Sequence, residues 1–366
     1  MKNSPCRWGV LGAAFIARKN WQAIRDAGNA RLVAVASRDV ERAAAFVAEC
    51  QASAPHAIVP EAMGSYDELL ARTDIDAVYI PLPTGLRKEW VLRAVQAGKH
   101  VMVEKPVGRN ADEVREIIAA CEKQRVQFMD GVMFMHGRRL KRMREVVDGD
   151  VGNVRHIASQ FSFMGGEEFQ RSNIRAHGAL EPLGCLGDLG WYCLRFSLWA
   201  MNYALPVQVT GRIHAETQQT GDAPPVPLEF SGTLTFAGGA SASFYCSFTA
   251  ANAQWAVVSG DRGLLQVSDF VLPFSGMQTE FSLLRSDFII NGCRFDMHEG
   301  CHSETLDEPS SNAPGSQESL LFRTFSDLVL SGKPDAHWPE ITLLTQRVLD
   351  ACLVSARQGS VPVAVA

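Results

Sequence analysis

A regular alternation of short apolar runs with longer amphipathic stretches constrains this chain more than any other feature. The apolar runs read as strands at residues 7–11, 31–36, 77–80, 101–103 and 126–128. Apolar residues at helical spacing fill the segments between several of them. Strands that alternate with helices in this way predict a doubly wound parallel sheet, whose ligands bind beyond the carboxyl ends of the strands.

One of these strands ends in a group of chemically useful residues. Val101 to Val103 is followed directly by Glu104, Lys105 and Pro106. Proline fixes its own φ and disfavours helical geometry at the preceding residue, so the turn after the strand is stiff. A lysine held there can donate a proton or a hydrogen bond to a substrate oxygen. The alternative interpretation is a solvated Glu–Lys pair, because charged residues are common at strand ends.

The first strand runs into a turn typical of a dinucleotide-binding βαβ unit. Gly12, Ala14 and Ala17 occupy the three positions of the glycine fingerprint, so the motif is degenerate. Alone, it fits an ordinary strand, turn and helix equally well. We predict that Gly12, Ala14, Phe15 and Ile16 contact the cofactor.

The second strand ends in Ser37, Arg38 and Asp39. Ser37 can hydrogen-bond a phosphate, and Arg38 can pair with the phosphate while lying over the adenine, so NADP is favoured and NAD remains possible. Asp39 argues for NAD unless it caps the helix that begins near Val40.

A loop with two prolines follows the strand at 77–80. We predict that Leu82, Pro83 and Thr84 of this loop contact the cofactor near its nicotinamide end, together with Glu104, Lys105 and Pro106. Further on, Met133 to His136 reads as a Met-rich strand, in which His136 is either a core residue or a contact of cofactor or substrate.

Beyond Val151 the pattern becomes β-rich, with strand-like stretches at 156–163, 207–215, 228–236, 240–248, 254–259 and 263–267. They predict one large, mostly antiparallel open sheet, which needs a cover on its second face, and a homodimer formed through this sheet would supply one. The polar stretch from Cys301 to Gln317 is predicted to be a loop. Helices within 316–357 close the chain and pack back on the first domain.

A helix is predicted around residues 180–195. Asp188 and Tyr192 are four residues apart and would share a helical face. A tyrosine hydroxyl beside a lysine ammonium can act as an acid or a base. The alternative is an amphipathic helix with Tyr192 at its rim. Asn173 and Arg175 precede this helix and are predicted, with Asp188 and His136, to bind substrate.

The composition of the chain limits the number of domains, the kind of partner and the compartment that we expect. A chain of 366 residues is long enough for two domains, and a net charge of −5 gives no reason to expect nucleic acid or membrane as a partner. The nine cysteines are dispersed and form no CxxC pair, so we expect reduced thiols, no metal site and a cytoplasmic protein.

Together these features resemble the family of glucose-fructose oxidoreductase, inositol dehydrogenase and dimeric dihydrodiol dehydrogenase. The matching segments are the Gly12 turn, Ser37-Arg38, Pro81-Leu82-Pro83-Thr84, the 97–101 lead-in to Glu104-Lys105-Pro106, and Asp188-Leu189-Gly190-Trp191-Tyr192. Tyr192 is similar to the dihydrodiol dehydrogenase and glucose-fructose oxidoreductase branch, since many relatives carry histidine there. Thr84 stands where relatives often have asparagine, and Arg87 where histidine is frequent.

The resemblance implies a Rossmann domain at 1–135, joined to an α+β domain at 136–366 that binds substrate and forms dimers. It also implies hydride transfer to or from sugars, polyols or dihydrodiols. We therefore expect an NAD(P)-dependent dehydrogenase or reductase with Lys105 and Tyr192 as its acid/base pair. Two alternatives stay open: an NAD-dependent glycosidase of related fold and a non-catalytic nicotinamide-binding regulator.

Overall fold

The computed structural model describes residues 4–365, apart from 167, 170–172, 219–223 and 312. The chain folds into two compact units. One comprises Met1–His136, His177–Pro182 and Ser311–Gln346, and the other comprises Gly137–Ala176, Leu183–Ser310 and Arg347–Ala366. The assignment of a cofactor domain to 1–135 and a substrate and dimer domain to 136–366 stays a prediction.

The first unit is built on a six-stranded sheet in the order β3-β2-β1-β4-β5-β6, and all its pairings are parallel. The predicted doubly wound sheet is therefore confirmed. The strands are β1 (Cys6–Leu11), β2 (Ala30–Ala36), β3 (Glu61–Met63), β4 (Ala77–Ile80), β5 (His100–Val103) and β6 (Phe128–Asp130).

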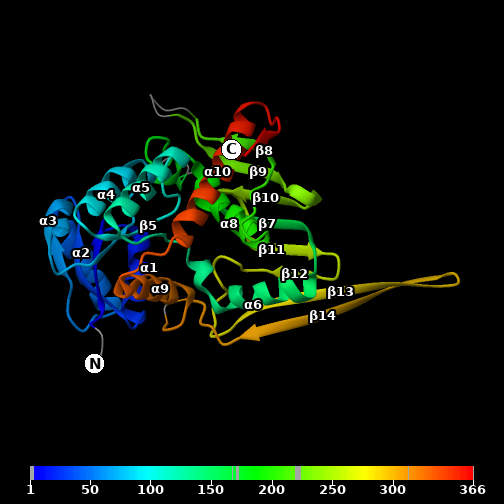
Figure 1. Ribbon diagram of the computed structural model, residues 1–366, viewed down its shortest axis with the longest axis horizontal. Helices are drawn as coiled ribbons and strands as arrows, with labels where there is room; N and C mark the ends of the chain where they lie inside the picture. Colours follow the sequence, from blue (N-terminus) through cyan, green and yellow to red (C-terminus); the bar gives the residue numbers. More distant parts are fainter. Residues whose placement is uncertain (1–3, 167, 170–172, 219–223, 312, 366) are drawn as a thin grey trace. The chain divides into compact units, whose positions relative to one another are not determined.

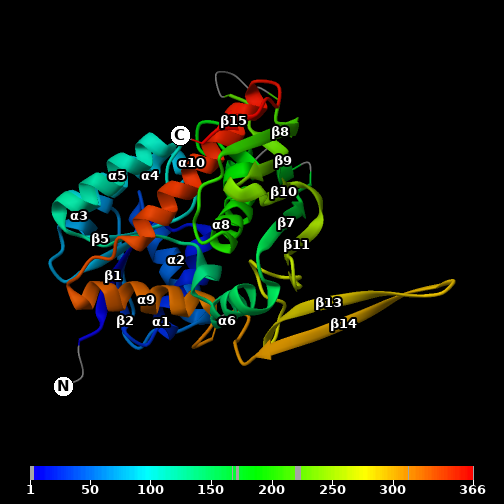
Figure 2. The same cartoon turned by 45° about the vertical axis from the view of Figure 1, so that its right-hand side comes forward.

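Helices cover this sheet on both faces. They are α1 (Phe15–Asp26), α2 (Val40–Ser53), α3 (Tyr66–Ala71), α4 (Thr84–Gln96), α5 (Ala111–Gln124), α9 (Gln317–Ser331) and the part of α10 (His337–Arg357) up to Gln346. In Figures 1 and 2, α4 lies beside α5 and α9 lies along α1. The central strand β4 is buried at every residue, as expected for a parallel sheet covered on both sides.

Residues from opposite ends of the chain share this core. Trp8 of β1 packs against Phe322 and Phe325 of α9, with ring centroids 5.0 Å apart in both pairs. Its indole Nε1 donates to Ser326 Oγ at 3.0 Å, so the buried N–H is satisfied. Helix α9 is therefore part of the first unit although it follows the second sheet in sequence.

The second unit contains a nine-stranded sheet in the order β14-β13-β12-β11-β7-β10-β9-β8-β15. Only its β7–β10 pair is parallel, which confirms the predicted mostly antiparallel sheet. Its strands are β7 (Val154–Met164), β8 (Gln208–Glu216), β9 (Pro227–Thr235), β10 (Ser241–Ser247), β11 (Thr249–Gly260), β12 (Leu264–Val267), β13 (Thr279–Asn291), β14 (Arg294–Leu306) and β15 (Val363–Ala364).

One face of this sheet is covered and the other is open. Helix α8 (Trp191–Ala200) packs on β7 and β10, and α6 (Arg138–Val146) packs on β13. In β10 the residues that face the helices, such as Phe244, are buried, whereas Ser243 and Tyr245 on the other face are partly exposed. This alternation, which holds from Ser241 to Cys246, is that of an antiparallel sheet with one solvated face.

Strands β13 and β14 form a long ribbon that extends beyond the neighbouring strands of their sheet (Figures 1 and 2). They pair from Thr279↔Leu306 to Asn291↔Arg294. The predicted loop from Cys301 to Gln317 is therefore wrong at its start, because residues 301–306 belong to β14. Their polar composition indicated a loop, but pairing with the preceding strand β13, from Leu284↔Cys301 to Thr279↔Leu306, determines their conformation.

The Met-rich segment is also corrected. Met133–His136 forms a 3-10 helix and not a strand. Four apolar residues are too few to separate the two periodicities, and here the segment packs against α9. In the part of the chain that the structure describes, no helix is long and apolar enough to cross a membrane.

Candidate active site

The carboxyl ends of β1, β4 and β5 meet at one edge of the parallel sheet. Gly12 follows β1 with φ +124, and a Cβ there would lie 3.1 Å from Leu82 of the β4 loop. The turn thus requires glycine for its backbone angle and for this close approach. Ala14 precedes α1 and its side chain makes no cap hydrogen bond, while the Ala17 N–H donates to the Ala14 carbonyl at 3.1 Å. The N-terminus of α1 therefore lacks a side-chain acceptor from its cap residue, and a phosphate could take that place.

Asp39 follows the end of β2 and caps α2. The Asp39 carboxylate accepts hydrogen bonds from the N–H groups of Glu41 and Arg42, at 2.8 and 3.2 Å. The capping interpretation of Asp39 is therefore confirmed. Its carboxylate is engaged by the helix backbone, which weakens the sequence argument for NAD.

Arg42 is a candidate cofactor residue that the sequence analysis missed. Burial raises the pKa of Tyr66, and the positive charges of Arg38 and Arg42 oppose that rise, so both guanidinium groups act on the same hydroxyl. The Tyr66 hydroxyl lies 3.8 Å from the Cβ position of Gly12. The available signal was a second arginine shortly after Arg38, in the first turn of α2.

At the end of β5, Glu104 and Lys105 are buried, with 7% and 9% of their surface exposed. Glu104 Oε1 accepts a hydrogen bond of 2.6 Å from the Tyr79 hydroxyl, which in turn accepts one of 2.6 Å from Asn20 Nδ2. Burial and the nearby Glu104 charge raise the pKa of Tyr79 well above its ordinary value. Tyr79 therefore remains a proton donor that fixes the Glu104 carboxylate.

The loop after β4 is held within the protein. The Thr84 side chain is 1% exposed, and its hydroxyl donates to Glu181 Oε2 and accepts from Arg87 Nη1. Pro83 is the residue that precedes α4. The structure thus brings Gly12, Leu82, Pro83, Thr84 and the 104–106 turn to one edge of the first unit, and their contact with a cofactor stays a prediction.

Three predicted substrate residues lie together in the second unit. Arg175 Nε is 3.0 Å from Asp188 Oδ2, and the Arg175 N–H donates to Asn173 Oδ1 at 3.0 Å. Tyr192 lies at the start of α8, is 6% exposed and contacts the Phe161 ring edge to face.

The helix predicted around residues 180–195 forms the α-helix α8 only from Trp191 onward. Asp188 lies in a π-helical turn, Leu186–Gly190, directly before α8. That Asp188 and Tyr192 share a face stays a prediction, because a π-helical turn also keeps residues four apart close to one side. Two glycines in the turn weaken its α-helical preference, and Gly190 allows close packing against Leu186 and Cys246. Sequence periodicity alone does not reveal such a turn.

His136 stacks on Trp338 within the first unit, with ring centroids 4.5 Å apart and an interplanar angle of 19°. Its role as a substrate contact stays a prediction. Among the described residues, no group of three or more His, Cys, Asp or Glu side chains is placed to hold a metal ion.

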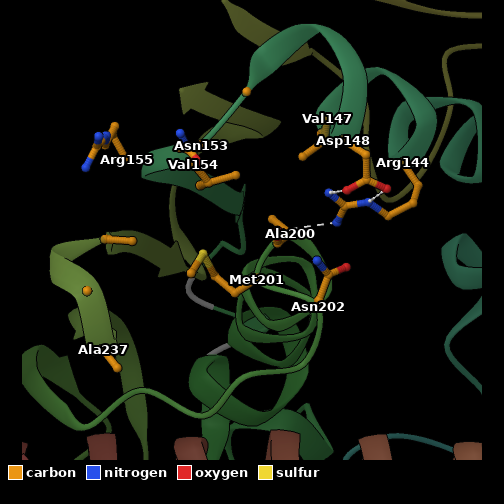
Figure 3. A pocket seen from close by; sticks show the side chains of 13 residues that line it. Arg144, Val147, Asp148, Asn153, Val154, Arg155, Ala200, Met201, Asn202 and Ala237 are labelled. Carbon is orange, nitrogen blue, oxygen red and sulfur yellow. Dashed lines mark hydrogen bonds and ion pairs between the residues drawn. The ribbon is translucent and has the colours of Figure 1, made fainter. Parts of the chain in front are cut away.

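A pocket of about 530 Å³ lies elsewhere in the second unit, and no predicted site residue lines it. Figure 3 shows the Arg144 guanidinium turned toward the Asp148 carboxylate; the Nη2–Oδ1 distance is 2.6 Å. Arg144 also donates to the carbonyls of Trp199 and Ala200. The cation is thus already paired within the protein, so this pocket is not our candidate site.

Comparison with known proteins decides the family. Residues 6–132 match the family model described as an oxidoreductase family with an NAD-binding Rossmann fold, and residues 140–266 match the GFO/IDH/MocA C-terminal domain. The D-xylose 1-dehydrogenase (NADP(+)) 2 of Haloferax volcanii is 32% identical over 265 residues, which cover 71% of this chain and 75% of that protein. This chain belongs to the Gfo/Idh/MocA oxidoreductase family.

Other members support the same assignment. The trans-1,2-dihydrobenzene-1,2-diol dehydrogenase of Mus musculus is 32% identical over 299 residues, which cover 78% of this chain and 84% of that protein. A 3-ketoreductase from Actinomadura kijaniata, solved with NADP and TDP-benzene, gives a TM-score of 0.79 at 26% identity; the match covers 97% of this chain and 98% of that one. The predicted family is confirmed, and this member is an NAD(P)-dependent dehydrogenase or reductase.

Proposed function

We propose that this enzyme transfers hydride between NADP(H) and a hydroxyl-bearing carbon of a sugar, polyol or dihydrodiol. The observation that carries the proposal is the buried Glu104-Lys105 pair directly after β5, at the same sheet edge as the Gly12 turn. Ligands of doubly wound sheets bind at this edge. The substrate class is supported by relatives named xylose dehydrogenase and dihydrodiol dehydrogenase.

In the proposed mechanism, Lys105 and Tyr192 bind the substrate oxygen. In the oxidative direction the C–H bond breaks with transfer of hydride to nicotinamide C4, which is the chemistry that the cofactor supplies. The O–H proton leaves through Lys105 or Tyr192 as the carbonyl forms. Asp188, oriented by its ion pair with Arg175, binds a neighbouring substrate hydroxyl, while Asn173 and His136 contact the rest of the substrate.

The preference for NADP is proposed from the residues at the end of β2. A 2′-phosphate carries negative charge, and Arg38 and Arg42 offer two guanidinium groups near Tyr66. Ser37 adds a hydroxyl at the strand end. The relative from Haloferax volcanii is named for NADP(+), and the ketoreductase was solved with NADP.

Two lysines that flank β5 provide a matched test. Lys105→Met is expected to lower kcat by about 10²–10⁴-fold with NADPH binding largely kept, since it removes the acid/base group only. Lys99→Met is the control, because Lys99 is also buried but donates to the carbonyls of Arg72 and Ile75 before the strand. Turnover is measured with NADP and NAD over a panel of aldoses, polyols and trans-dihydrodiols.

The same turnover measurements distinguish the proposed enzyme from a nicotinamide-binding regulator and from a glycosidase. Unchanged turnover in Lys105→Met contradicts the mechanism. Tight NADPH binding without turnover of any compound favours a nicotinamide-binding regulator. Release of free sugar from glycosides without net change of cofactor favours a glycosidase.

We also propose a homodimer formed through the open face of the second sheet. The outer part of the β13–β14 ribbon exposes five large apolar side chains, each between 50% and 69% exposed: Phe288, Ile289, Ile290, Phe295 and Met297. The pairs Phe288↔Met297 and Ile290↔Phe295 lie on the side of the ribbon that continues the open face through Leu284. A second copy related by a two-fold axis would cover both surfaces at once.

A further inference from the structure

Arg87 is a buried arginine whose guanidinium joins the two loops that follow β4 and β5. It is 5% exposed. Its Nε donates to the Leu82 carbonyl at 2.6 Å, and its Nη1 donates to Thr84 Oγ1 at 2.9 Å and to the Pro106 carbonyl. Pro106 directly follows Lys105. The Arg87 side chain therefore connects the loop after β4 to the turn that carries Lys105.

Glu181 holds this arrangement from the other side. Its Oε1 accepts from the Thr84 N–H at 3.1 Å and lies 3.8 Å from Arg87 Nη2, while Oε2 accepts from the Thr84 hydroxyl. The carboxylate therefore caps the N-terminus of α4 and balances the buried guanidinium charge.

The backbone of residues 179 and 180 packs against the start of α4. Gly85 donates its N–H to the Leu180 carbonyl at 2.9 Å. A Cβ at Gly85 would lie 2.4 Å from the Ala179 carbonyl oxygen, which no real side chain tolerates. Segment 177–182 is thus seated directly on the start of α4, within the first unit.

We propose that Arg87 is a positioning residue for catalysis, which holds the Lys105 turn through the Pro106 carbonyl and is itself oriented by Thr84 and Glu181. The inference rests on the proposed role of Lys105 as an acid/base group. A planar guanidinium presents several N–H groups in a fixed fork, so it reaches three acceptors on two loops. The hydroxyl of Thr84 suits its place because it donates to the carboxylate and accepts from the guanidinium at the same time.

Thr84 and Arg87 have no polar group left for the substrate. Their polar groups are occupied by each other and by Glu181, so they act on the reaction through the loops and not by touching the substrate. A displacement of a reacting group by about 1 Å costs on the order of a hundredfold in rate. Loss of the Arg87 contacts should therefore lower kcat more than it lowers affinity for NADPH.

The test compares Arg87→Met, Arg87→Lys and Thr84→Val with Lys99→Met, which removes a buried cation that also donates to two carbonyls. For each we measure kcat, the Kd of NADPH and Tm. We expect kcat to fall about a hundredfold in Arg87→Met and about tenfold in Thr84→Val. Arg87→Lys should retain intermediate turnover, because lysine keeps the positive charge but lacks the planar set of N–H donors of the guanidinium. The Kd of NADPH should change little in both Arg87 variants, and Lys99→Met should lose only stability.

A double-mutant cycle with Lys105→Met separates the two proposals. If Arg87 acts through Lys105, adding Arg87→Met to Lys105→Met lowers the residual turnover no further. Additive losses, or an Arg87→Met kcat equal to that of Lys99→Met, overturn the positioning role while the proposed function stands. Thr84→Val gives the same decision if Arg87→Met fails to fold. Full turnover in Lys105→Met overturns the proposed acid/base role of Lys105, and the positioning role of Arg87 with it.

Discussion

The two sheets of this protein use their surfaces in opposite ways. The six-stranded sheet is covered on both faces, and its central strand β4 is buried at every position. In the described part of the chain, helices cover the nine-stranded sheet on one face only, so partly exposed and buried residues alternate along β10 up to Cys246. A sheet enclosed by helices has only its strand ends free for chemistry, whereas a half-covered sheet keeps a broad face for contact with a partner.

The polar residues follow this division. In the first unit Glu104, Lys105 and Thr84 come after strand ends, and their carboxylate, amine and hydroxyl groups are buried. In the second unit the open face carries Ser243, Tyr245 and Trp255 along neighbouring strands, all partly exposed. The comparison predicts that substitutions in the first sheet change folding and cofactor use, and that substitutions on the open face change assembly.

The largest expected effect contrasts one tryptophan from each sheet. Trp8→Ala should lower the free energy of unfolding by about 3–5 kcal/mol, because it empties a packed site between β1 and α9. Trp255→Ala on the open face should lower the free energy of unfolding clearly less, because Trp255 is already partly exposed. Urea unfolding at protein concentrations low enough to dissociate an assembly measures both. Equal losses would show that the two sheets are not covered differently.

The next effect concerns the cofactor edge of the first sheet. Arg38→Ala and Arg42→Ala should each lower kcat/KM for NADP by about 10–100-fold, since each removes a charge-assisted contact with the 2′-phosphate. The value for NAD should stay nearly the same. Arg93→Ala is the control, because Arg93 is an exposed arginine paired with Asp67 and Glu89. Parallel losses with both cofactors would contradict the assignment of these arginines.

A smaller effect tests the open face and its ribbon. Ile290→Ser should weaken self-association about tenfold, because it removes an apolar side chain from the surface proposed to contact a second copy. Ile289→Ser is the matched control, since Ile289 pairs with Asp296 on the opposite side of the same ribbon. Sedimentation equilibrium over a dilution series measures both. A monomeric wild-type protein, or equal effects of the two changes, would refute the proposed interface.

The smallest effect is a pH dependence of the first unit. Burial lowers the pKa of His56 and His100 below their ordinary value of 6.5. The unfolded chain then binds more protons near pH 6, so the stability present above pH 6.5 is lost as the pH falls toward the folded pKa values.

His100→Gln is the variant that checks this sign. His100 Nδ1 accepts a hydrogen bond of 2.8 Å from the Gln127 N–H, and a glutamine oxygen can accept it without titrating. The difference in urea midpoint between pH 7.5 and pH 5.5 should therefore shrink in this variant. An identical difference in wild type and variant would contradict the prediction.

Much of the fold and several features of the candidate site could be predicted from local sequence. Apolar runs at residues 77–80 and 101–103 indicated buried parallel strands because both of their faces are hydrophobic. Asp39 before Val40 left two interpretations, a contact with the cofactor ribose and a helix cap, and the structure shows the cap because the carboxylate meets free N–H groups. The motif around Lys105 indicated the family because stiff turns at strand ends depend on residues that are adjacent in sequence.

Tertiary structure alone decided the features that join distant segments. Strand β14 formed from a polar stretch because β13 supplied its hydrogen bonds, with Leu306 opposite Thr279. The sequence predicted that the closing helices pack on the first domain, but only the fold placed Phe322 and Phe325 of α9 against Trp8. The network of Thr84, Arg87 and Glu181 could not be foreseen, since Glu181 lies 97 residues after Thr84 in the chain. Local sequence determines which conformations a segment prefers. Its partners are chosen by burial and hydrogen bonding across the folded chain, which no short window of residues contains.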